Sequence, residues 1–385
     1  MTGRAVTVLL CQTVWQLSMD EIGPFLEMTD IDREQRQGAS QPLFDPIARE
    51  RLRAHLRAHG HELGPEEFSR FAGGLANLNY SVMVDGNRTV LRMPPSGELP
   101  PGAHDMVREH RVMSALSEAL PLVPRSIYLC QDRSVLGVPF QLIEFRPGVV
   151  IHGTNLGQFE DRPHIGEELS QMMIETLTKI HAVDPKSVGL DEFGKPEGFT
   201  ERAIEGWVKR ANHVTDTPAL SSLVDELATW MHSWKTIEQK PTLLHCDFKL
   251  DNCILDPNSL QPVAVIDWDM GTRGHPLFDL ATMLSYWAEP NDPPCMQKLG
   301  QMPTSRSGFA SRREVIERYA ALSGVRMDDF GLFRTLAVFK LGVVFLQLHK
   351  RWRAGGIGDE RYGSFDILGV ELLEFARSIA RGQAE

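Results

Sequence analysis

A short stretch of the sequence, residues 245–252, gathers side chains of the types that carry out chemistry. It reads HCDFKLDN, so a histidine, two aspartates, a lysine and an asparagine are interleaved with Phe248 and Leu250. Apolar side chains that alternate with acids are typical of a loop anchored to a core while its polar groups face a cleft. The stretch therefore indicates a functional loop.

A predicted hairpin follows this loop directly. The runs CIL and VAVI flank a Pro-Asn-Ser turn, which is typical of two short antiparallel strands. This pairing places Leu255 opposite about Val263. It also places Asn252 opposite about Ile266, beside Asp267. The hairpin thus brings a second polar segment next to the loop.

Three side chains are expected to converge at this end of the hairpin. Asn252 and Asp267 share that end, and Asp247 lies in the loop that enters it. Two carboxylates and an amide oxygen are hard ligands that suit Mg²⁺, an ion that keeps several waters and usually bridges phosphates. The pattern therefore predicts a magnesium-assisted phosphate site.

An acid also stands on the apolar face of a predicted helix, HDMVREHRVMSALSEAL. The apolar residues recur at helical intervals on one face, which carries Met106, Met113, Leu116 and Leu120. Glu109 falls on the same face, whereas its neighbours Arg108 and Arg111 point off it. Burying a carboxylate without a cation costs several kcal/mol, so we expect a partner for Glu109 from elsewhere in the chain.

The motifs together resemble a known group of enzymes. HCDFKLDN resembles the protein-kinase catalytic loop H-R-D-x-x-x-x-N, and IDWD stands where the metal-binding D-F-G would stand. LLHCDFKLDN, VAVIDWDMGTRGHPLFDLA, VLRMPP and REHRVMSAL are similar to the aminoglycoside phosphotransferase and choline kinase superfamily, and most of all to its branch associated with acyl-CoA dehydrogenases. The resemblance spans about residues 44–350. It implies an α+β, bilobal protein-kinase-like fold, with a small β-sheet N-lobe that has one key helix and a larger, mainly helical C-lobe.

The resemblance assigns a role to each residue of the loop. Asp247 would accept the proton of a substrate hydroxyl, and Lys249 would neutralise the transferred phosphoryl group. Asn252 and Asp267 would hold the Mg²⁺ that bridges the phosphates of ATP. The expected activity is therefore transfer of the γ-phosphoryl group of ATP to a hydroxyl of a small molecule.

The same resemblance assigns the nucleotide-binding residues of the N-lobe. Gly73 and Gly74 would form a turn whose backbone N–H groups cover the phosphates. Arg92 would reach the phosphates and pair with Glu109, which explains the acid on the apolar face. Glu144 and Phe145 would form the hinge, whose backbone groups bind the purine.

The elements that position these residues divide the chain into three expected parts. Residues 1–40 show no sustained period and are expected to be a flexible, dispensable extension, with Met19 or Met28 as an alternative start. Residues 41–147 would form the nucleotide-binding N-lobe. Residues 148–385 would form the helical C-lobe, with the catalytic loop and the substrate site.

Local signals support this division. PIARERLRAHLRAHG predicts a helix that ends at Gly60, and Asp85-Gly86 between two β-rich runs predicts a tight hairpin. PFQLIEFRPG predicts a strand that leaves the N-lobe near residue 148. The segments EELSQMMIETLTKIHAV, ALSSLVDELATWMHSW, HPLFDLATMLSYWA, REVIERYAALSG and residues 331–353 predict helices.

The bulk properties fit such an enzyme and exclude other classes. With 385 residues and 42% hydrophobic composition, the chain is long enough for two cores, and its net charge of −11 argues against a nucleic-acid surface. Five scattered cysteines without a CxxC pair predict neither disulfides nor zinc and favour a cytoplasmic setting. The start MTGRAVTVLLCQ lacks a small-residue cleavage site, so we expect no signal peptide. LAVFKLGVVFLQLHKRW is interrupted by Lys340 and Gln347, so we expect a core helix and no membrane span.

Two other functions fit the same motifs. A nucleotide-binding pseudokinase would act as a scaffold, although the intact Asp247, Asn252 and Asp267 argue against it. An antibiotic-resistance kinase for aminoglycosides would need an acidic cleft, to which Asp292 and Asp328 could contribute. A hydroxyacyl or lipid-like substrate would instead need an apolar or Arg-bearing cleft, which SYWAEP and FLQLHKRW could provide. The acceptor stays open at this point.

Several neighbouring residues are expected to have structural roles. His245 would brace the loop, and Asp279 would anchor a helix against it. Cys246 lacks a matched base and is expected to be inert. Three further residues depart from the pattern of the resembled family without removing the base or a metal ligand: Arg92, Asp269 and His275.

Overall fold

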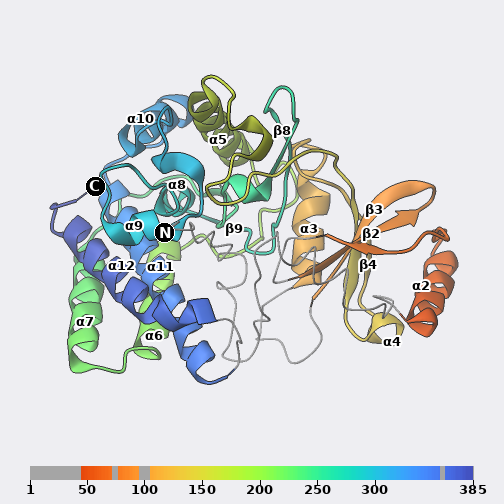
Figure 1. The fold of residues 1–385 in the computed structure, drawn as a ribbon, viewed down its shortest axis with the longest axis horizontal. Helices are drawn as coiled ribbons and strands as arrows, with labels where there is room; N and C mark the ends of the chain where they lie inside the picture. Colours follow the sequence, from red (N-terminus) through yellow and green to blue (C-terminus); the bar gives the residue numbers. More distant parts are fainter. Residues whose placement is uncertain (1–44, 72–76, 95–104, 356–359, 385) are drawn as a thin grey trace, which may run out of the picture.

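The computed structural model describes residues 45–71, 77–94, 105–355 and 360–384 of the chain. Two predictions lie outside these ranges, namely the extension at residues 1–40 and the phosphate-covering turn at Gly73 and Gly74. The described residues form a smaller lobe built on a sheet and a larger lobe built from helices (Figure 1). The predicted α+β, bilobal architecture is confirmed.

A five-stranded antiparallel sheet forms the smaller lobe. Its order is β1-β2-β3-β5-β4, with β1 Ser69–Arg70, β2 Leu78–Val84, β3 Asn87–Met93, β4 Ser126–Cys130 and β5 Phe140–Glu144. The predicted hairpin joins β2 to β3, where Asp85 and Gly86 have φ angles of 53° and 73°. Positive φ at both central residues matches the twist of the flanking strands, which is why an Asp-Gly pair is favoured there.

Three helices accompany the sheet: α2 Pro46–Ala58, α3 Met106–Leu116 and α4 Arg133–Leu136. The helix α2 ends at Ala58 with His59 as its C-cap, and Gly60 follows with a φ of 84°, close to the predicted end. Its apolar face packs on the sheet at the outer edge of the smaller lobe. The helix α3 contacts β4 and β5 of the sheet, and Val112, Met113 and Leu116 on its apolar face join the hydrophobic cluster that continues into the larger lobe. Because α3 lies between the lobes, its side chains reach the cleft.

The larger lobe consists mainly of α5 Ile165–Ala182, α6 Phe199–Asn212, α7 Pro218–Ser233, α8 Pro276–Ser285, α9 Pro294–Leu299, α10 Arg312–Ser323, α11 Phe330–Arg353 and α12 Phe365–Ala380. The predicted helical segments correspond to α5, α7, α8, α10 and α11. The helices α6, α9 and α12 are not among them.

The helix α11 is the centre of this lobe. In the described part of the chain it is the helix whose length and composition would suit a membrane span, yet 89% of its most apolar window is buried inside the fold. The helices α8 and α12 pack against it. At the α11–α12 contact, a Cβ on Gly342 would lie 2.9 Å from the carbonyl oxygen of Gly369, so both glycines permit the close approach. The prediction of a core helix is confirmed.

Two short ribbons hold the polar loops. The strand β6 Thr242–Leu244 pairs with β9 Thr272–Gly274, and β7 Cys253–Leu255 pairs with β8 Pro262–Val265. Residues 245–252 connect β6 to β7, with a short 3₁₀ turn at Leu250–Asn252, and residues 266–271 connect β8 to β9. Both connections therefore leave the ribbons on the same side, which places the two polar segments together.

The predicted register of the hairpin is confirmed where it matters for the site. The Ile266 amide donates a hydrogen bond to the Asn252 carbonyl oxygen at 3.0 Å. Farther along, an irregularity leaves Val263 of β8 as an extra residue, so Leu255 pairs with Pro262, one residue away from the predicted Val263. An extra residue accommodated in one strand shifts the pairing beyond it, and the sequence alone does not reveal that shift.

Candidate active site

The loop that carries Asp247 is held by an acid from α8. Asp279 is fully buried, and its two carboxylate oxygens accept hydrogen bonds from the amides of His245 and Cys246, each at 2.6 Å. His181 lies 3.2 Å from the same carboxylate. These hydrogen bonds hold the pKa of Asp279 below its usual value although burial acts to raise it. The predicted anchoring role of Asp279 is confirmed.

His245 connects this loop to the segment that carries Asp267. Its Nε2 lies 2.9 Å from the carbonyl oxygen of Ile266, and its Nδ1 accepts a hydrogen bond from the Asp247 amide at 3.3 Å. The side chain is completely buried and packs at 4.7 Å, between ring centroids, against Trp268. His245 therefore braces the loop, as predicted.

The backbone on both sides of the site is in the left-handed region. Cys246 and Asp267 each have a φ of 68°, a conformation that costs a residue with a side chain roughly 1–3 kcal/mol. The Asp279 carboxylate holds the first of these residues, and the His245 ring holds the carbonyl that precedes the second. The fold thus maintains two strained residues in the site, one next to the predicted base Asp247 and the other the predicted metal ligand Asp267 itself.

The carboxylate of Asp247 is buried and has several partners. Its Oδ1 accepts a hydrogen bond from the Tyr286 hydroxyl at 2.9 Å, and its Oδ2 accepts one from Asn252 Nδ2 at 3.2 Å. Lys249 Nζ lies 3.7 Å from Oδ2 and 3.3 Å from Asp251 Oδ2. Burial raises the pKa of Asp247, and the nearby charge of Lys249 partly opposes that rise. The group is therefore an oriented carboxylate with an enhanced tendency to take up a proton.

Arg92 joins the two lobes. Its Nε donates to Glu109 Oε2 at 2.9 Å, and Gln141 Nε2 donates to the same oxygen at 2.7 Å. The predicted pair between Arg92 and Glu109 is thus confirmed. Arg92 Nη2 also donates to Asp267 Oδ1 at 2.6 Å, a contact that the sequence did not predict. Burial would lower the pKa of Arg92, but the surrounding carboxylates outweigh it and raise that pKa.

The described residues gather a marked excess of buried negative charge at this point. The carboxyl groups belong to Glu109, Asp247, Asp251, Asp267 and Asp269, and the cations paired with them are Arg92 and Lys249. Burial, and then repulsion from Asp267 and Glu109, raises the pKa of Asp269 far above its usual value. Asp269 was not predicted as a functional residue, although it lies only two positions after Asp267. A bound cation would relieve this repulsion.

The donor set fits Mg²⁺ in the manner predicted. In the described ranges no three side chains of His, Cys, Asp or Glu are arranged to enclose an ion. Mg²⁺ in phosphotransferases is commonly held by one or two protein oxygens together with nucleotide phosphates and waters. The amide of Asn252 and the carboxylate of Asp267, beside a cluster of buried acids, match that type of site.

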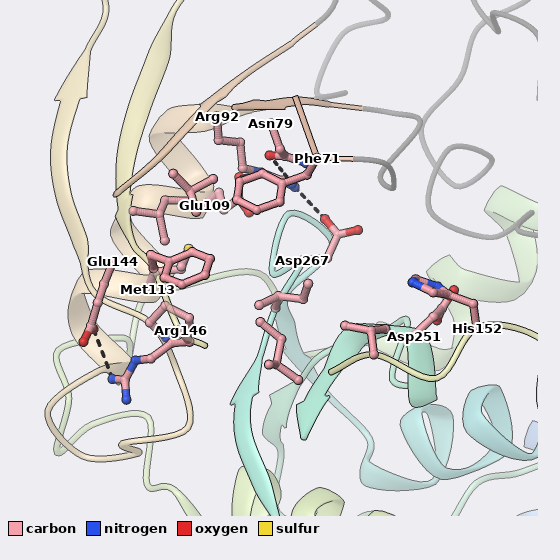
Figure 2. A pocket seen from close by; sticks show the side chains of 17 residues that line it. Phe71, Asn79, Arg92, Glu109, Met113, Glu144, Arg146, His152, Asp251 and Asp267 are labelled. Atoms are coloured by element: carbon pink, nitrogen blue, oxygen red, sulfur yellow. Dashed lines mark hydrogen bonds and ion pairs between the residues drawn. The ribbon is translucent and has the colours of Figure 1, made fainter. Parts of the chain in front are cut away.

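A cavity of about 280 Å³ opens between the sheet and the β7–β8 hairpin (Figure 2). Its apolar lining includes Val90, Met113, Ile143, Ile254 and Ile266. Phe71 and Phe145 also line it and stack on each other, with the ring centroids 6.1 Å apart. Figure 2 shows Glu144 and Arg146 at one end of the cavity, Asp251 and His152 side by side at the other, and the Arg92–Asp267 pair between them. The shape and polarity suit a molecule with a flat apolar part and a charged part.

The predicted hinge lies at the end of the cavity where Figure 2 shows Glu144 and Arg146. Glu144 and Phe145 both line it, and the Glu144 carboxylate accepts a hydrogen bond from Arg146 at 3.1 Å. The Glu144 amide donates to the Arg125 carbonyl oxygen at 2.9 Å, within the extension of the sheet. A purine would therefore bind other backbone groups of this segment. Binding of the purine here stays a prediction.

The structure adds residues to the predicted site. Tyr286, Asp251 and His152 reach the base or the cavity. Asp251 belongs to the motif from which the prediction started, and its acidic side chain in a loop with alternating apolar residues could have identified it. Tyr286 and His152 carry no such signal, because only tertiary packing brings them to the cleft.

Comparisons with known proteins found a matching family model, curated relatives and similar solved structures. Residues 67–315 match the Phosphotransferase enzyme family, APH. The chain is 32% identical, over 77% of its length, to acyl-CoA dehydrogenase family member 10 of Mus musculus. It is 28% identical, over 86% of its length, to acyl-CoA dehydrogenase family member 11 of Rattus norvegicus. The chain covers only 27% and 42% of those two proteins.

Solved structures share the fold. A candidate aminoglycoside phosphotransferase from Ralstonia eutropha superposes with a TM-score of 0.72 at 23% identity, covering 87% of this chain and 98% of that chain. Aminoglycoside phosphotransferase APH(4)-Ia, in a ternary complex with AMP-PNP and hygromycin B, gives a TM-score of 0.54 at 18% identity, covering 83% and 95%. At such identities the likeness establishes the fold and not the substrate.

Proposed function

Because this chain belongs to the phosphotransferase enzyme family, we propose that it transfers the γ-phosphoryl group of ATP to a hydroxyl of a small molecule. The observation that carries this proposal is the convergence of Asp247, Asn252 and Asp267 beside the interlobe cavity. Asn252 donates to the Asp247 carboxylate at 3.2 Å, and the Ile266 amide ties the Asp267 segment to Asn252 at 3.0 Å.

Asp247 would orient the acceptor hydroxyl and take up its proton. Its carboxylate is fixed by Tyr286 and Asn252, so a hydroxyl that binds to it meets a defined geometry. Burial raises the pKa of Asp247, which strengthens it as a proton acceptor. Lys249, held between two carboxylates, would place a positive charge near the transferred group. Phosphoryl transfer depends mainly on such positioning and charge stabilisation.

Asn252 and Asp267 would hold Mg²⁺, which when bound neutralises the charge of the nucleotide phosphates. Arg92 donates a hydrogen bond from Nε to Glu109 Oε2 at 2.9 Å and another from Nη2 to Asp267 Oδ1 at 2.6 Å. Because a guanidinium fork binds phosphate oxygens in pairs, Arg92 would hold the phosphates from the side of the sheet. The predicted turn at Gly73 and Gly74 would cover them.

The alternative functions receive less support. A scaffold that only binds nucleotide has no need for an oriented, buried Asp247 with a raised pKa. Asp292, a candidate for an acidic acceptor cleft, is bound by both Nη atoms of Arg312 at 2.5 and 2.6 Å. Arg351, a candidate for an Arg-bearing cleft, is only 3% exposed, in the core helix α11. Neither residue defines the acceptor.

The proposal is tested by consumption of ATP in the presence of candidate acceptors. The panel contains aminoglycosides, hydroxyl-bearing metabolites and hydroxyacyl thioesters, the last because the relatives carry an acyl-CoA dehydrogenase name. We expect one acceptor class to stimulate formation of ADP in the wild type and not in Asp247→Asn. Nucleotide binding that persists without stimulation by any hydroxyl compound, and without Mg²⁺ dependence, would favour the scaffold.

A further inference from the structure

Two polar atoms at one end of the cavity have no hydrogen-bond partner among the described residues. They are Asp251 Oδ1 and His152 Nδ1, and both atoms are buried. Both residues line the same cavity as the hinge, and Figure 2 shows their side chains next to each other at the end away from Glu144. Because a buried polar atom without a partner is costly, such atoms in a cavity indicate where a ligand supplies the partner.

The two residues are held in place by the surrounding structure. Asp251 lies in the 3₁₀ turn Leu250–Asn252, and its second oxygen, Oδ2, is 3.3 Å from Lys249 Nζ. His152 follows Val149, whose backbone exchanges two hydrogen bonds with Leu255, at 2.9 and 2.8 Å. The strand β7 therefore fixes the segment that carries His152 next to the turn that carries Asp251.

The chemistry of the pair suits hydroxyl groups. Burial lowers the pKa of His152, so its ring is neutral at neutral pH and offers one donor and one acceptor nitrogen. The Asp251 carboxylate only accepts hydrogen bonds, and its charge would repel a phosphate. A hydroxyl donates to the carboxylate and exchanges a hydrogen bond with the imidazole. Two adjacent hydroxyls on one ligand would satisfy both orphaned atoms.

The acceptor substrate is the less suitable source of these hydroxyls. An acceptor must reach the Asp247 carboxylate, and Asp247 is not among the residues that line this cavity, whereas the hinge residues are. With a purine at the hinge and phosphates near Arg92 and Asp267, the sugar that connects them is the part of the nucleotide that would reach Asp251 and His152.

We propose that Asp251 and His152 form a ribose subsite, in which Asp251 Oδ1 and His152 Nδ1 bind the adjacent 2′ and 3′ hydroxyls of the nucleotide. This inference rests on the proposed function, because it assumes that the cavity holds a nucleotide. It makes the enzyme selective for ribonucleotides over deoxyribonucleotides.

The test compares the binding of ADP, 2′-deoxyADP and 3′-deoxyADP in the presence of Mg²⁺, by calorimetry. We expect the wild type to bind at least one of the deoxynucleotides about tenfold or more weakly than ADP, the usual effect of losing a hydrogen bond to a charged group. In Asp251→Ala and His152→Ala, ADP should weaken toward the affinity of the deoxynucleotide, while the deoxynucleotide itself changes little.

Matched variants identify the atoms involved. His152→Asn keeps an amide near the position of Nδ1 and should retain the preference for ADP, whereas His152→Gln places the amide nearer Nε2 and should lose it. Glu144→Gln changes a carboxylate at the opposite end of the same cavity and should affect ADP and the deoxynucleotides equally. Melting temperatures report whether each variant is folded.

The outcomes separate this inference from the proposed function. Equal affinity of the folded wild type for ADP and both deoxynucleotides would overturn the ribose subsite and leave the proposed function standing. Variants at Asp251 and His152 that weaken ADP and the deoxynucleotides by the same factor would also overturn it. A wild type that binds no ADP at all would overturn the proposed function together with the subsite.

Discussion

Replacing Asp247 with asparagine is the sharpest test of the proposed chemistry. The substitution keeps the size of the side chain and removes its charge. The Tyr286 hydroxyl now donates to one oxygen and Asn252 to the other, so asparagine satisfies both only if the tyrosine hydroxyl turns to accept. The variant therefore keeps the packing of the loop and loses the proton acceptor.

We expect turnover to fall by roughly a hundredfold or more, the usual scale for a general base, which corresponds to about 2.7 kcal/mol of transition-state stabilisation. Nucleotide affinity should change little, because Asp247 does not line the cavity. The melting temperature should stay the same or rise, because burial raises the pKa of Asp247 and so opposes its ionised form in the folded state.

The measurement is single-turnover transfer from labelled ATP to the acceptor found by screening, alongside calorimetry of ADP and thermal melting. Tyr286→Phe is the matched comparison, since it deletes one hydrogen bond to Asp247 and leaves the charge in place. It should lower turnover by about tenfold, in line with one hydrogen bond to a charged group. Unchanged turnover in Asp247→Asn would place the chemistry elsewhere, and a large loss of ADP affinity would recast Asp247 as part of the nucleotide site.

Three further substitutions probe the surroundings of the site. Asp267→Ala should abolish the Mg²⁺ dependence of nucleotide binding, and calorimetry that shows undiminished metal-dependent binding would refute its role. Asp279→Ala leaves the two amides it holds without an acceptor and should cost about 3–5 kcal/mol of unfolding free energy, measured in urea. Burial lowers the pKa of His275 from 6.5, so the unfolded chain binds more protons and stability should fall as the pH drops below that value. His275→Asn should flatten this dependence below about pH 6.5, and an unaltered slope would show that other groups cause it.

The sequence was sufficient for those features whose cause is local. Asp247 and Asn252 lie within one short loop, so the sequence itself gives their spacing. The pairing of the hairpin that follows, with its two-residue alternation of side chains, predicts which residues lie together at its end. The helical period of residues 106–116 placed Glu109 on a buried face, and the cost of an unpaired buried charge required a cation for it. The family resemblance then supplied the identity of that cation, Arg92, which the structure confirms.

The helices α6 and α12 were not predicted, although their sequences carry a local helical pattern. Both have one buried face, with Ile204 and Trp207 in α6 and Leu372 and Leu373 in α12. The small sheet formed by β6 and β9 is different, since its strands have three residues each and lie far apart in the chain. A run of three residues carries too little periodicity to be recognised, so only its partner strand defines it.

The geometry of the site itself was decided by tertiary structure. Tyr286 meets Asp247 across 39 residues of sequence, and Arg92 meets Asp267 across 175. Periodicity states which face of an element is buried, but it does not state which distant residue lies opposite that face. That choice depends on how α3, α8 and the hairpin pack around one cleft, where few arrangements satisfy every buried charge at once. The sequence therefore determined which residues carry the chemistry, and the packing of the two lobes determined which atoms they touch.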